Sequence, residues 1–399
     1  MKIGIIKERK NPPDRRVVLS PKKCKEILLK YPKLEIKVES SKDRFFSDND
    51  YSKEGIQVVT DVSDCDVLLG VKEVPVDYLI PNKKYFFFSH TIKKQPYNKN
   101  LLKEILKKNI TLFDHEVITN AKGQRLVAFG RYAGIVGAYN GFRTFGLKHN
   151  LYNMSKASVL NNQQELISEL KKLTLPSIKI VLTGKGRVGN GAKEMLDGMG
   201  LKEVLVKDFL NKSFDQPVYT QIDVLDYNKR IDGKVLGETD FFKNPKEYEG
   251  NFKRFTKVAD MYIAGHFYAA GAPFIFTNED AKSDNCKITV VADISCDING
   301  PVASTIRASE IASPIYGYNP NTGKEVNYKN KNAIAVMAVD NLPCELPKDA
   351  SEGFGENFVK YVIPSFFNDD KNGILKRAKM TENGKLTPSF MYLQDYVNS

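Results

Sequence analysis

A glycine-rich segment in the middle of the chain constrains the fold more than any other feature. It reads Gly184-Lys185-Gly186-Arg187-Val188-Gly189, and it lies between the apolar run at 178–183 and a helical pattern at 192–196. A strand, a turn with three spaced glycines and a helix form the fingerprint that binds a dinucleotide pyrophosphate at the helix N-terminus. The sequence therefore predicts a Rossmann-like unit, in which Gly184, Gly186, Arg187, Val188 and Gly189 bind the cofactor. An ordinary glycine turn in an α/β protein is the alternative.

An acidic residue after the next apolar run indicates which dinucleotide is bound. The run Val204-Leu205-Val206 predicts a second strand, and Lys207 and Asp208 follow it. A carboxylate at this point accepts hydrogen bonds from the ribose 2′-OH of NAD and repels the 2′-phosphate of NADP. Asp208 therefore favours NAD, and the basic side chains of Lys207 and Arg187 leave NADP open.

Length and composition indicate a soluble protein of two domains. The chain has 399 residues and 42% hydrophobic residues, which suffice for two buried cores. Its longest apolar runs are strand-sized, and its first residues lack the apolar region and cleavage site of a signal peptide. The five cysteines are scattered without a CxxC pair, which predicts free thiols in the cytoplasm and no metal site.

The net charge of +12 is compatible with three kinds of partner: nucleic acid, an anionic substrate, or solvent around a lysine-rich surface. The lysines are spread along the chain, and no nucleic-acid motif or dense basic block is present. We therefore expect a solvated basic surface that attracts anionic small molecules, with neither nucleic acid nor membrane as a partner. The sequence leaves the oligomeric state open.

Strand and helix patterns alternate along most of the chain, which is typical of parallel sheets covered by helices. The small-residue segment at 134–139 predicts a helix that crosses between domains, and the segment at 341–362 predicts a helix that returns to the first domain. The expected fold is α/β, with two Rossmann-like domains whose parallel sheets flank a cleft. The first domain is discontinuous (1–134 and 333–399) and provides the substrate site, and the inserted domain (135–332) binds NAD(P).

Two residues at predicted strand ends are candidates for acid–base chemistry. Lys72 and His90 each follow an apolar strand, and active sites of open α/β sheets lie at the carboxyl ends of strands. A crowded lysine has a lowered pKa, and histidine titrates near neutrality without help. The alternatives are a solvated Lys72 paired with Glu73 and a His90 that caps a turn through Ser89.

Arginine and carboxylate residues nearby are candidates for substrate binding. Arg16 follows the first predicted strand, where a guanidinium binds a carboxylate in bidentate fashion or forms a surface ion pair with Asp14. Glu116 and Arg125 can orient a polar substrate or form a buried structural pair. The remaining histidines lack metal-ligand spacing and are predicted to be structural or surface residues: His115, His149 and His266.

Several segments together resemble a known superfamily. The chain resembles the alanine dehydrogenase and nicotinamide-transhydrogenase superfamily, and within it the lysine-forming saccharopine dehydrogenases and the lysine–ketoglutarate reductase part of the bifunctional animal and plant enzymes. The resemblance spans nearly the whole chain. The segments that carry it are 16–21 (RVVLSP), 71–75 (VKEVP), 87–93 (FFSHTIK), 126–134 (LVAFGRYAG), 293–297 (DISCD) and 340–343 (DNLP).

The resemblance implies an NAD(P)-dependent reductive amination that joins the lysine ε-amine to 2-oxoglutarate and gives saccharopine, or the reverse reaction. It implies that Lys72 and His90 are the acid–base pair and that no metal takes part. It also implies that Arg16 and Arg125 bind or support substrate carboxylates, that Glu116 tunes the site and that Asp293 lies at the cofactor edge. The segments after Asp208 and at 265–273 depart from the family pattern, so the amino donor stays open.

Two other functions remain as alternatives. An alanine dehydrogenase or an opine-type dehydrogenase would use a different amino donor or oxo acid on the same scaffold. A non-catalytic module would bind NAD without transferring a hydride, and the presence of both Lys72 and His90 argues against it.

Overall fold

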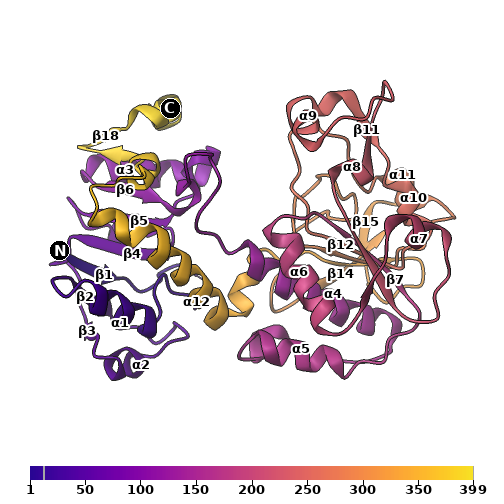
Figure 1. Cartoon of the computed structure of the whole chain (residues 1–399), viewed down its shortest axis with the longest axis horizontal. Coiled ribbons are helices and arrows are strands. Elements are labelled where there is room, and N and C mark those ends of the chain that lie inside the picture. Colours follow the sequence, from indigo (N-terminus) through magenta and orange to yellow (C-terminus); the bar gives the residue numbers. More distant parts are fainter. Residues whose placement is uncertain (12–13, 399) are drawn as a thin grey trace. The chain divides into compact units, whose positions relative to one another are not determined.

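The computed structural model describes residues 1–11 and 14–398, which divide into two compact units. Unit 1 comprises Met1–Phe129 and Pro347–Ser399, and unit 2 comprises Gly130–Leu346. Within unit 1 the N-terminal and C-terminal parts of the chain lie side by side, as the indigo and yellow ribbons in Figure 1 show. Unit 1 is therefore discontinuous in sequence.

Unit 1 is built on a six-stranded sheet in the order β3-β2-β1-β4-β5-β6, and every neighbouring pair is parallel. Its central strands are buried, so apolar and aromatic residues fill them. A parallel sheet has all its carboxyl ends on one edge, where the loops that carry function gather. The strands are β1 (Lys2–Ile5), β2 (Glu35–Glu39), β3 (Gln57–Val59), β4 (Val67–Lys72), β5 (Lys84–Phe88) and β6 (Thr111–Asp114).

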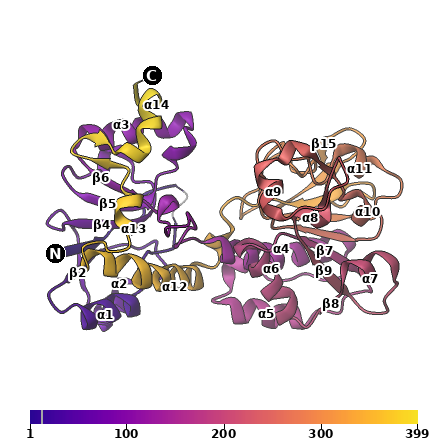
Figure 2. The ribbon, with the colours of Figure 1, turned by 45° about the horizontal axis from the view of Figure 1, so that its top comes forward.

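The C-terminal segment completes unit 1. The Val17 N–H donates to Ser351 Oγ at 2.9 Å, and the Leu112 N–H donates to Thr381 Oγ1 at 2.9 Å. The helices around the sheet come from both parts of the chain (Figure 2). They are α1 (Pro21–Lys30), α2 (Asp48–Lys53), α3 (Lys99–Lys107), α12 (Pro347–Asn357), α13 (Ile374–Ala378) and α14 (Gln394–Asn398), with a short hairpin of β17 (Thr381–Glu382) and β18 (Lys385–Leu386).

Unit 2 contains an eight-stranded sheet in the order β15-β14-β16-β13-β12-β7-β9-β8. This sheet is mixed rather than parallel throughout, because β14 runs antiparallel to both of its neighbours. The strands are β7 (Lys179–Thr183), β8 (Lys202–Glu203), β9 (Val218–Ile222), β12 (Met261–Ala264), β13 (Val290–Asp293), β14 (Ile315–Asn319), β15 (Lys324–Val326) and β16 (Ile334–Met337).

Two helices of unit 2 pack unusually closely through glycines. A Cβ at Gly134 of α4 would lie 2.0 Å from the Val188 carbonyl oxygen, and one at Gly191 of α6 would lie 2.0 Å from the Arg131 oxygen.

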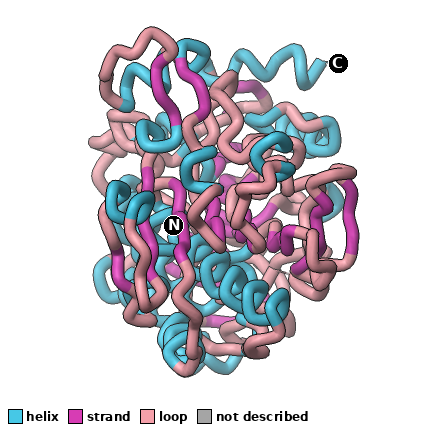
Figure 3. Tube along the Cα trace, turned by 90° about the vertical axis from the view of Figure 1, so that its right-hand side faces the viewer, coloured by secondary structure: helices cyan, strands magenta, loops and turns pink. Residues whose placement is uncertain are grey.

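Figure 3 distinguishes helices from strands along the trace. The unit 2 helices are α4 (Gly130–His149), α5 (Gln163–Lys171), α6 (Arg187–Gly198), α7 (Val206–Asn211), α8 (Val224–Tyr227), α9 (Glu238–Lys243), α10 (Lys253–Thr256) and α11 (Asn278–Lys282), with a small hairpin of β10 (Asn228–Arg230) and β11 (Tyr248–Gly250).

The chain passes between the units at Phe129/Gly130 and at Leu346/Pro347. The sequence pattern placed these passages at 134/135 and 332/333. The second differs because β16 pairs with β13 and β14 and so belongs to the sheet of unit 2. Across residues 1–11 and 14–398, the structure contains no helix whose length and apolar character would let it cross a membrane.

Candidate active site

The carboxyl edge of the unit 1 sheet brings together the residues predicted for acid–base chemistry and substrate binding. Lys72 is the last residue of β4 and is opposite Phe88 in the β4–β5 register. His90 follows β5 by two residues, and Glu116 follows β6 by two residues. Because these strands are parallel neighbours, three chemically active side chains start from adjacent points of one edge.

His90 and Glu116 form the centre of this group. The His90 Nδ1 atom lies 3.6 Å from Glu116 Oε2, and Glu116 Oε1 lies 3.8 Å from Lys93 Nζ and 4.0 Å from Arg125 Nη1. Burial raises the pKa of Glu116, but contact with His90 and the charges of Lys93 and Arg125 outweigh burial and leave the pKa below its usual value. Glu116 is therefore an anion at neutral pH.

A buried carboxylate fixes the backbone on both sides of this pair. Asp114, which is fully buried, accepts the Ser89 N–H at 3.1 Å and the Glu116 N–H at 2.7 Å. His90 has a φ of +56°, a left-handed conformation that is uncommon outside glycine and marks a constrained position. Its side chain makes no hydrogen bond that caps the turn at 91–93 of the described structure, so the capping role is not observed.

Arg16 forms the ion pair with Asp14, but the pair is buried rather than on the surface. The Arg16 Nε and Nη2 atoms donate to the two Asp14 carboxylate oxygens at 3.0 and 2.6 Å, and both residues are at most 3% exposed. The Arg16 guanidinium also lies over the Phe129 ring at 4.2 Å, while that of Arg125 lies over the Phe88 ring at 5.9 Å. The two rings are 6.0 Å apart, so one aromatic cluster supports both arginines.

The backbone that carries Lys72 is held by two neighbours. Glu8 accepts the Lys72 N–H at 2.9 Å, and His115 Nε2 lies 2.9 Å from the Gly70 carbonyl oxygen. Burial lowers the pKa of His115 to about 3, so this histidine stays neutral and donates to that oxygen. Glu73 pairs with Lys10.

The C-terminal segment adds a residue that sequence reasoning missed. Tyr392 lies within the short helix Pro388–Leu393, and Lys94 Nζ lies 5.5 Å from its ring centre. Burial and the charges of Asp114 and Glu116 raise the pKa of Tyr392. No local sequence signal connects residues about three hundred positions apart.

In unit 2 the glycine segment forms the predicted strand, turn and helix. Gly184 has a φ of +93°, and a Cβ at Gly189 would lie 1.9 Å from the Gly184 carbonyl oxygen. At Gly186 no described atom lies within 4 Å of the Cβ position, so this glycine faces open space before the first turn of α6. The N–H groups of a helix N-terminus beside an open glycine backbone fit a pyrophosphate.

The strand predicted to lead to Asp208 is wrong. The segment at 204–206 does not form the second strand: residues 206–211 form the helix α7, and Asp208 pairs with Lys212 at 3.0 Å. β7 pairs with β12 on one side and with β9 on the other, and Asp223 directly follows β9. Asp223 therefore occupies the position from which an acidic residue reaches a bound ribose.

The other predicted cofactor residues differ in their surroundings. Arg187 and Val188 begin α6, where the Arg187 side chain is exposed. Asp293 is fully buried at the end of β13, and its carboxylate accepts hydrogen bonds from the loop that follows: from the Ser295 N–H, the Ser295 hydroxyl, the Cys296 N–H and the Thr305 hydroxyl. Asp293 thus anchors this loop.

The remaining histidines have separate environments. His266 is buried against the glycine turn, where its Nδ1 lies 3.0 Å from Thr183 Oγ1, and burial lowers its pKa to about 4. His149 is exposed and contacts Thr289. Across the described residues, no group of three or more His, Cys, Asp or Glu side chains could hold a metal ion.

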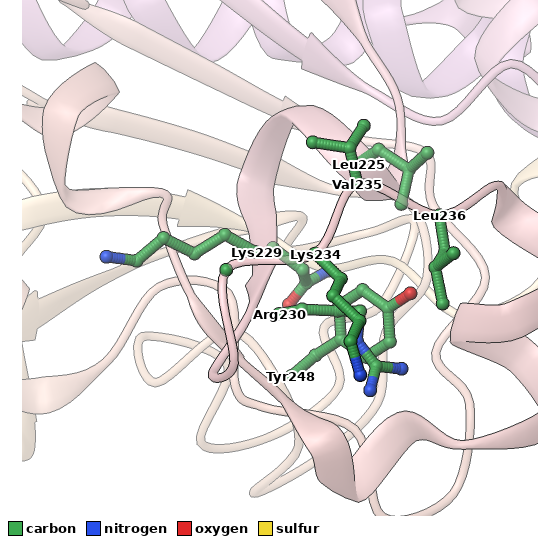
Figure 4. A pocket seen from close by; sticks show the side chains of 9 residues that line it. Leu225, Lys229, Arg230, Lys234, Val235, Leu236 and Tyr248 are labelled. Carbon is green, nitrogen blue, oxygen red and sulfur yellow. The ribbon is translucent and has the colours of Figure 1, made fainter.

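A cavity of about 270 Å³ lies beside the β10–β11 hairpin of unit 2, and none of the predicted site residues lines it (Figure 4). Its basic residue Arg230 is paired with Asp232, Asp240 and Glu247. The cavity is lined by Leu225, Asn228, Lys229, Arg230, Gly233, Lys234, Val235, Leu236 and Tyr248.

Comparisons with known proteins agree with these features. Residues 4–136 match the family of the alanine dehydrogenase/PNT N-terminal domain. A solved L-alanine dehydrogenase covers the whole chain with a TM-score of 0.68 at 17% identity, which shows a shared fold. The expectation of an α/β fold with two Rossmann-like domains is confirmed at this level.

Similarity in sequence extends over both units. The alpha-aminoadipic semialdehyde synthase of Arabidopsis thaliana is 28% identical over 98% of this chain and 41% of its own length. A saccharopine dehydrogenase [NAD(+), L-lysine-forming] of Yarrowia lipolytica is 24% identical over 90% of both chains. The chain spans less than half the length of the semialdehyde synthases. Residues 4–136 are thus similar to the alanine dehydrogenase/PNT N-terminal domain, and the chain as a whole is similar to proteins named saccharopine dehydrogenase and alpha-aminoadipic semialdehyde synthase.

Proposed function

We propose that this protein is an NAD-dependent oxidoreductase that joins the ε-amine of lysine to 2-oxoglutarate and gives saccharopine, or catalyses the reverse oxidative deamination. One observation carries the proposal: Lys72, His90 and Glu116 start from adjacent strand ends of one parallel sheet. Relatives that match along nearly their whole length are named as lysine-forming saccharopine dehydrogenases. An alanine dehydrogenase is supported by the family match of residues 4–136 and by a shared fold at 17% identity.

The charges of unit 1 fit substrates of this class. 2-Oxoglutarate and saccharopine carry several carboxylates, and guanidinium groups bind carboxylates in bidentate geometry. The Arg125 Nη1 atom lies 4.0 Å from Glu116 Oε1 and its side chain is partly exposed, so Arg125 is the arginine best placed to exchange this contact for a substrate carboxylate. Arg16 is bound to Asp14 on the same aromatic cluster and supports that surface.

Amine condensation and its reversal need two proton transfers, one at the amine and one at the carbinolamine oxygen. Lys72 and His90 are the proposed acid–base groups for these steps. Glu116 is an anion next to His90, so it stabilises the imidazolium when His90 holds a proton. Lys93 and Arg125 place positive charge beside the other oxygen of the same carboxylate.

The nucleotide would be held by unit 2 at Gly184, Gly186 and Gly189, with Arg187 and Val188 at the start of α6. When bound, NAD(H) supplies or accepts the hydride. We propose NAD rather than NADP because Asp223 lies at the end of β9, where a carboxylate repels a 2′-phosphate.

The test is NADH oxidation in the presence of lysine and 2-oxoglutarate. We expect turnover by the wild-type protein and a fall in kcat of about 100-fold or more for Lys72→Met and His90→Gln, because each loses one acid–base group. Lys22→Met and His149→Gln are matched controls on exposed sites, and we expect them to retain wild-type kcat.

Substrate exchange separates the alternatives. Turnover with ammonia and pyruvate in place of lysine and 2-oxoglutarate would replace the proposal by an alanine dehydrogenase, and turnover with ornithine would change the amino donor. NAD binding by calorimetry without hydride transfer to any of these pairs would indicate a binding module. Wild-type kcat in both Lys72→Met and His90→Gln would reject the assigned roles.

A further inference from the structure

Glu8 lies in the segment after β1, and its side chain binds the backbone at the end of β4. Glu8 Oε1 accepts the Val71 N–H at 2.6 Å, and Oε2 accepts the Lys72 N–H at 2.9 Å. Both oxygens of one carboxyl group are therefore committed to two successive peptide groups. The second of these belongs to the residue proposed as an acid–base group.

The sheet explains why β4 needs this partner. The β1–β4 ladder pairs Ile3, Gly4 and Ile5 with residues 67–69, and it ends with the Ile6 N–H donating to the Leu69 oxygen. Further along, the β4–β5 register shifts between Leu69 and Lys72. Backbone N–H groups in a protein interior need acceptors, and here a side chain replaces the missing strand.

Gly70, which precedes Val71 and Lys72, is also held in place by its neighbours. His115 binds the Gly70 carbonyl oxygen at 2.9 Å, and a Cβ at Gly70 would lie 2.9 Å from Ile6 Cδ1. Residues 70–72 thus have little freedom to move as long as Glu8 keeps both hydrogen bonds.

We propose that Glu8 is the positioning residue for Lys72, holding its backbone so that the amine starts from a fixed point at the sheet edge. This role rests on the proposed function, because it assigns Lys72 to proton transfer. A carboxylate accepts both N–H groups fully, whereas a protonated carboxyl has one weakened acceptor. The strength of the hydrogen bonds from the Val71 and Lys72 N–H groups therefore depends on the charge of Glu8.

The groups around Glu8 determine where that change occurs. Burial and the charge of Asp14 raise the pKa of Glu8 to about 8, and the two N–H donors and Arg16 act in the opposite direction. We expect the two hydrogen bonds to strengthen as the pH rises through about 8. Asp14 and Arg16 are themselves bound to each other through two hydrogen bonds.

The first experiment needs no substrate. In a protein with ¹⁵N-labelled valine and lysine, we expect the amide protons of Val71 and Lys72 to shift together with a midpoint near pH 8. Glu8→Gln should abolish this titration, and Glu26→Gln on the exposed face of α1 should leave it unchanged. The same titration in Glu8→Gln would overturn the proposal.

The second experiment measures kcat with lysine and 2-oxoglutarate. Since a displacement of about 1 Å costs up to about 100-fold in rate, we expect kcat to fall at least about tenfold in Glu8→Gln and further in Glu8→Ala, with KM for NADH unchanged. We also expect Glu8→Gln to lose the step near pH 8 in the pH profile. Wild-type kcat and pH profile in a folded Glu8→Gln would overturn the role. Absence of wild-type turnover would reject the proposed function, and the amide titration would still decide whether Glu8 holds residues 71 and 72.

Discussion

At several strand ends of this protein, a single carboxylate accepts the hydrogen bonds of backbone N–H groups. Glu39 accepts the Lys7 N–H at 3.0 Å, and Asp114 and Asp293 accept N–H groups of the loops that follow β6 and β13. A parallel strand leaves unpaired N–H groups where its neighbour stops, and an acidic side chain satisfies them with a charge-assisted bond. An aspartate at a strand end can therefore anchor a loop without touching a ligand, and the hydrogen bonds of Asp293 are those of such an anchor.

The position of Asp223 predicts how nucleotide preference can be altered. We expect Asp223→Ser to raise the ratio of kcat/KM for NADPH to that for NADH by about tenfold or more, equivalent to about 1.4 kcal/mol, because a repelling charge is removed. Asp208→Ser is the matched control, since Asp208 lies on α7 and pairs with Lys212. A larger change in Asp208→Ser than in Asp223→Ser would contradict the assignment.

Glu345 predicts a pH dependence of stability. It is 3% exposed and accepts the Asn140 side-chain amide at 2.8 Å, and burial raises its pKa to about 7. Between its unfolded pKa of about 4.5 and this value the folded state binds more protons, so the free energy of unfolding falls as the pH rises. The contribution is fully present below about pH 4.5 and is lost above about pH 7.

The measurement is urea unfolding of wild type and Glu345→Gln between pH 5 and 8. Gln keeps the acceptor oxygen and cannot ionise, so we expect the wild type to lose about 2–3 kcal/mol more than the variant over this range. Parallel curves for the two proteins would show that Glu345 does not titrate there.

At the scale of elements, the contact between α4 and α6 depends on glycine rather than on side-chain packing. Gly134 and Gly191 each meet a carbonyl oxygen of the opposite helix at 2.0 Å from their Cβ positions. The same α6 begins with the glycine turn, so helix packing and the nucleotide site share one element.

Two glycine substitutions separate these roles. We expect Gly191→Ala to lower stability by about 1–3 kcal/mol, because the methyl group forces the helices apart. Gly186→Ala meets open space, so its Tm should match that of the wild type while its affinity for NADH falls. Calorimetric unfolding and titration measure the two effects, and equal loss of Tm in both variants would refute this division.

Element-level prediction succeeded for the strands of unit 1 and failed at residues 204–206 of unit 2. All six strands of unit 1 and the turn at 184–189 follow from β-branched and aromatic runs bounded by turn residues. The strand predicted at 204–206 was wrong, because a run of three apolar residues fits a strand or the start of a helix equally well. Leu205 within it is 76% exposed. The true neighbour of β7, at 218–222, carries Tyr, Thr and Gln and gives a weak apolar signal.

The candidate site shows the same division. Lys72, His90 and Glu116 were predictable because strand ends of a parallel sheet share an edge. Glu8 could not be predicted, because its hydrogen bonds depend on where β1 stops along β4. Tyr392 could not be predicted either, because it lies on a segment distant in sequence from Lys94.

For the molecule as a whole, the sequence indicated an inserted second unit, and the structure divides the chain in this manner with passages at Phe129/Gly130 and Leu346/Pro347. Unit 2 is continuous and has its own sheet and core. Unit 1 is assembled from two pieces, and residues on both of them contribute to its core.

Because the two pieces of unit 1 flank unit 2 in the sequence, unit 1 cannot be completed on the ribosome until unit 2 has been made. The edge strand β6 is covered by Lys379, which forms a bridge with Phe113, and by the Thr381 hydroxyl. Lys379 and Thr381 are translated only after unit 2. At roughly 5–20 residues per second, β6 stays uncovered for about ten seconds or more, which is when unpaired strand edges recruit other chains. We therefore expect the nascent first unit to be most prone to association with other chains during this interval.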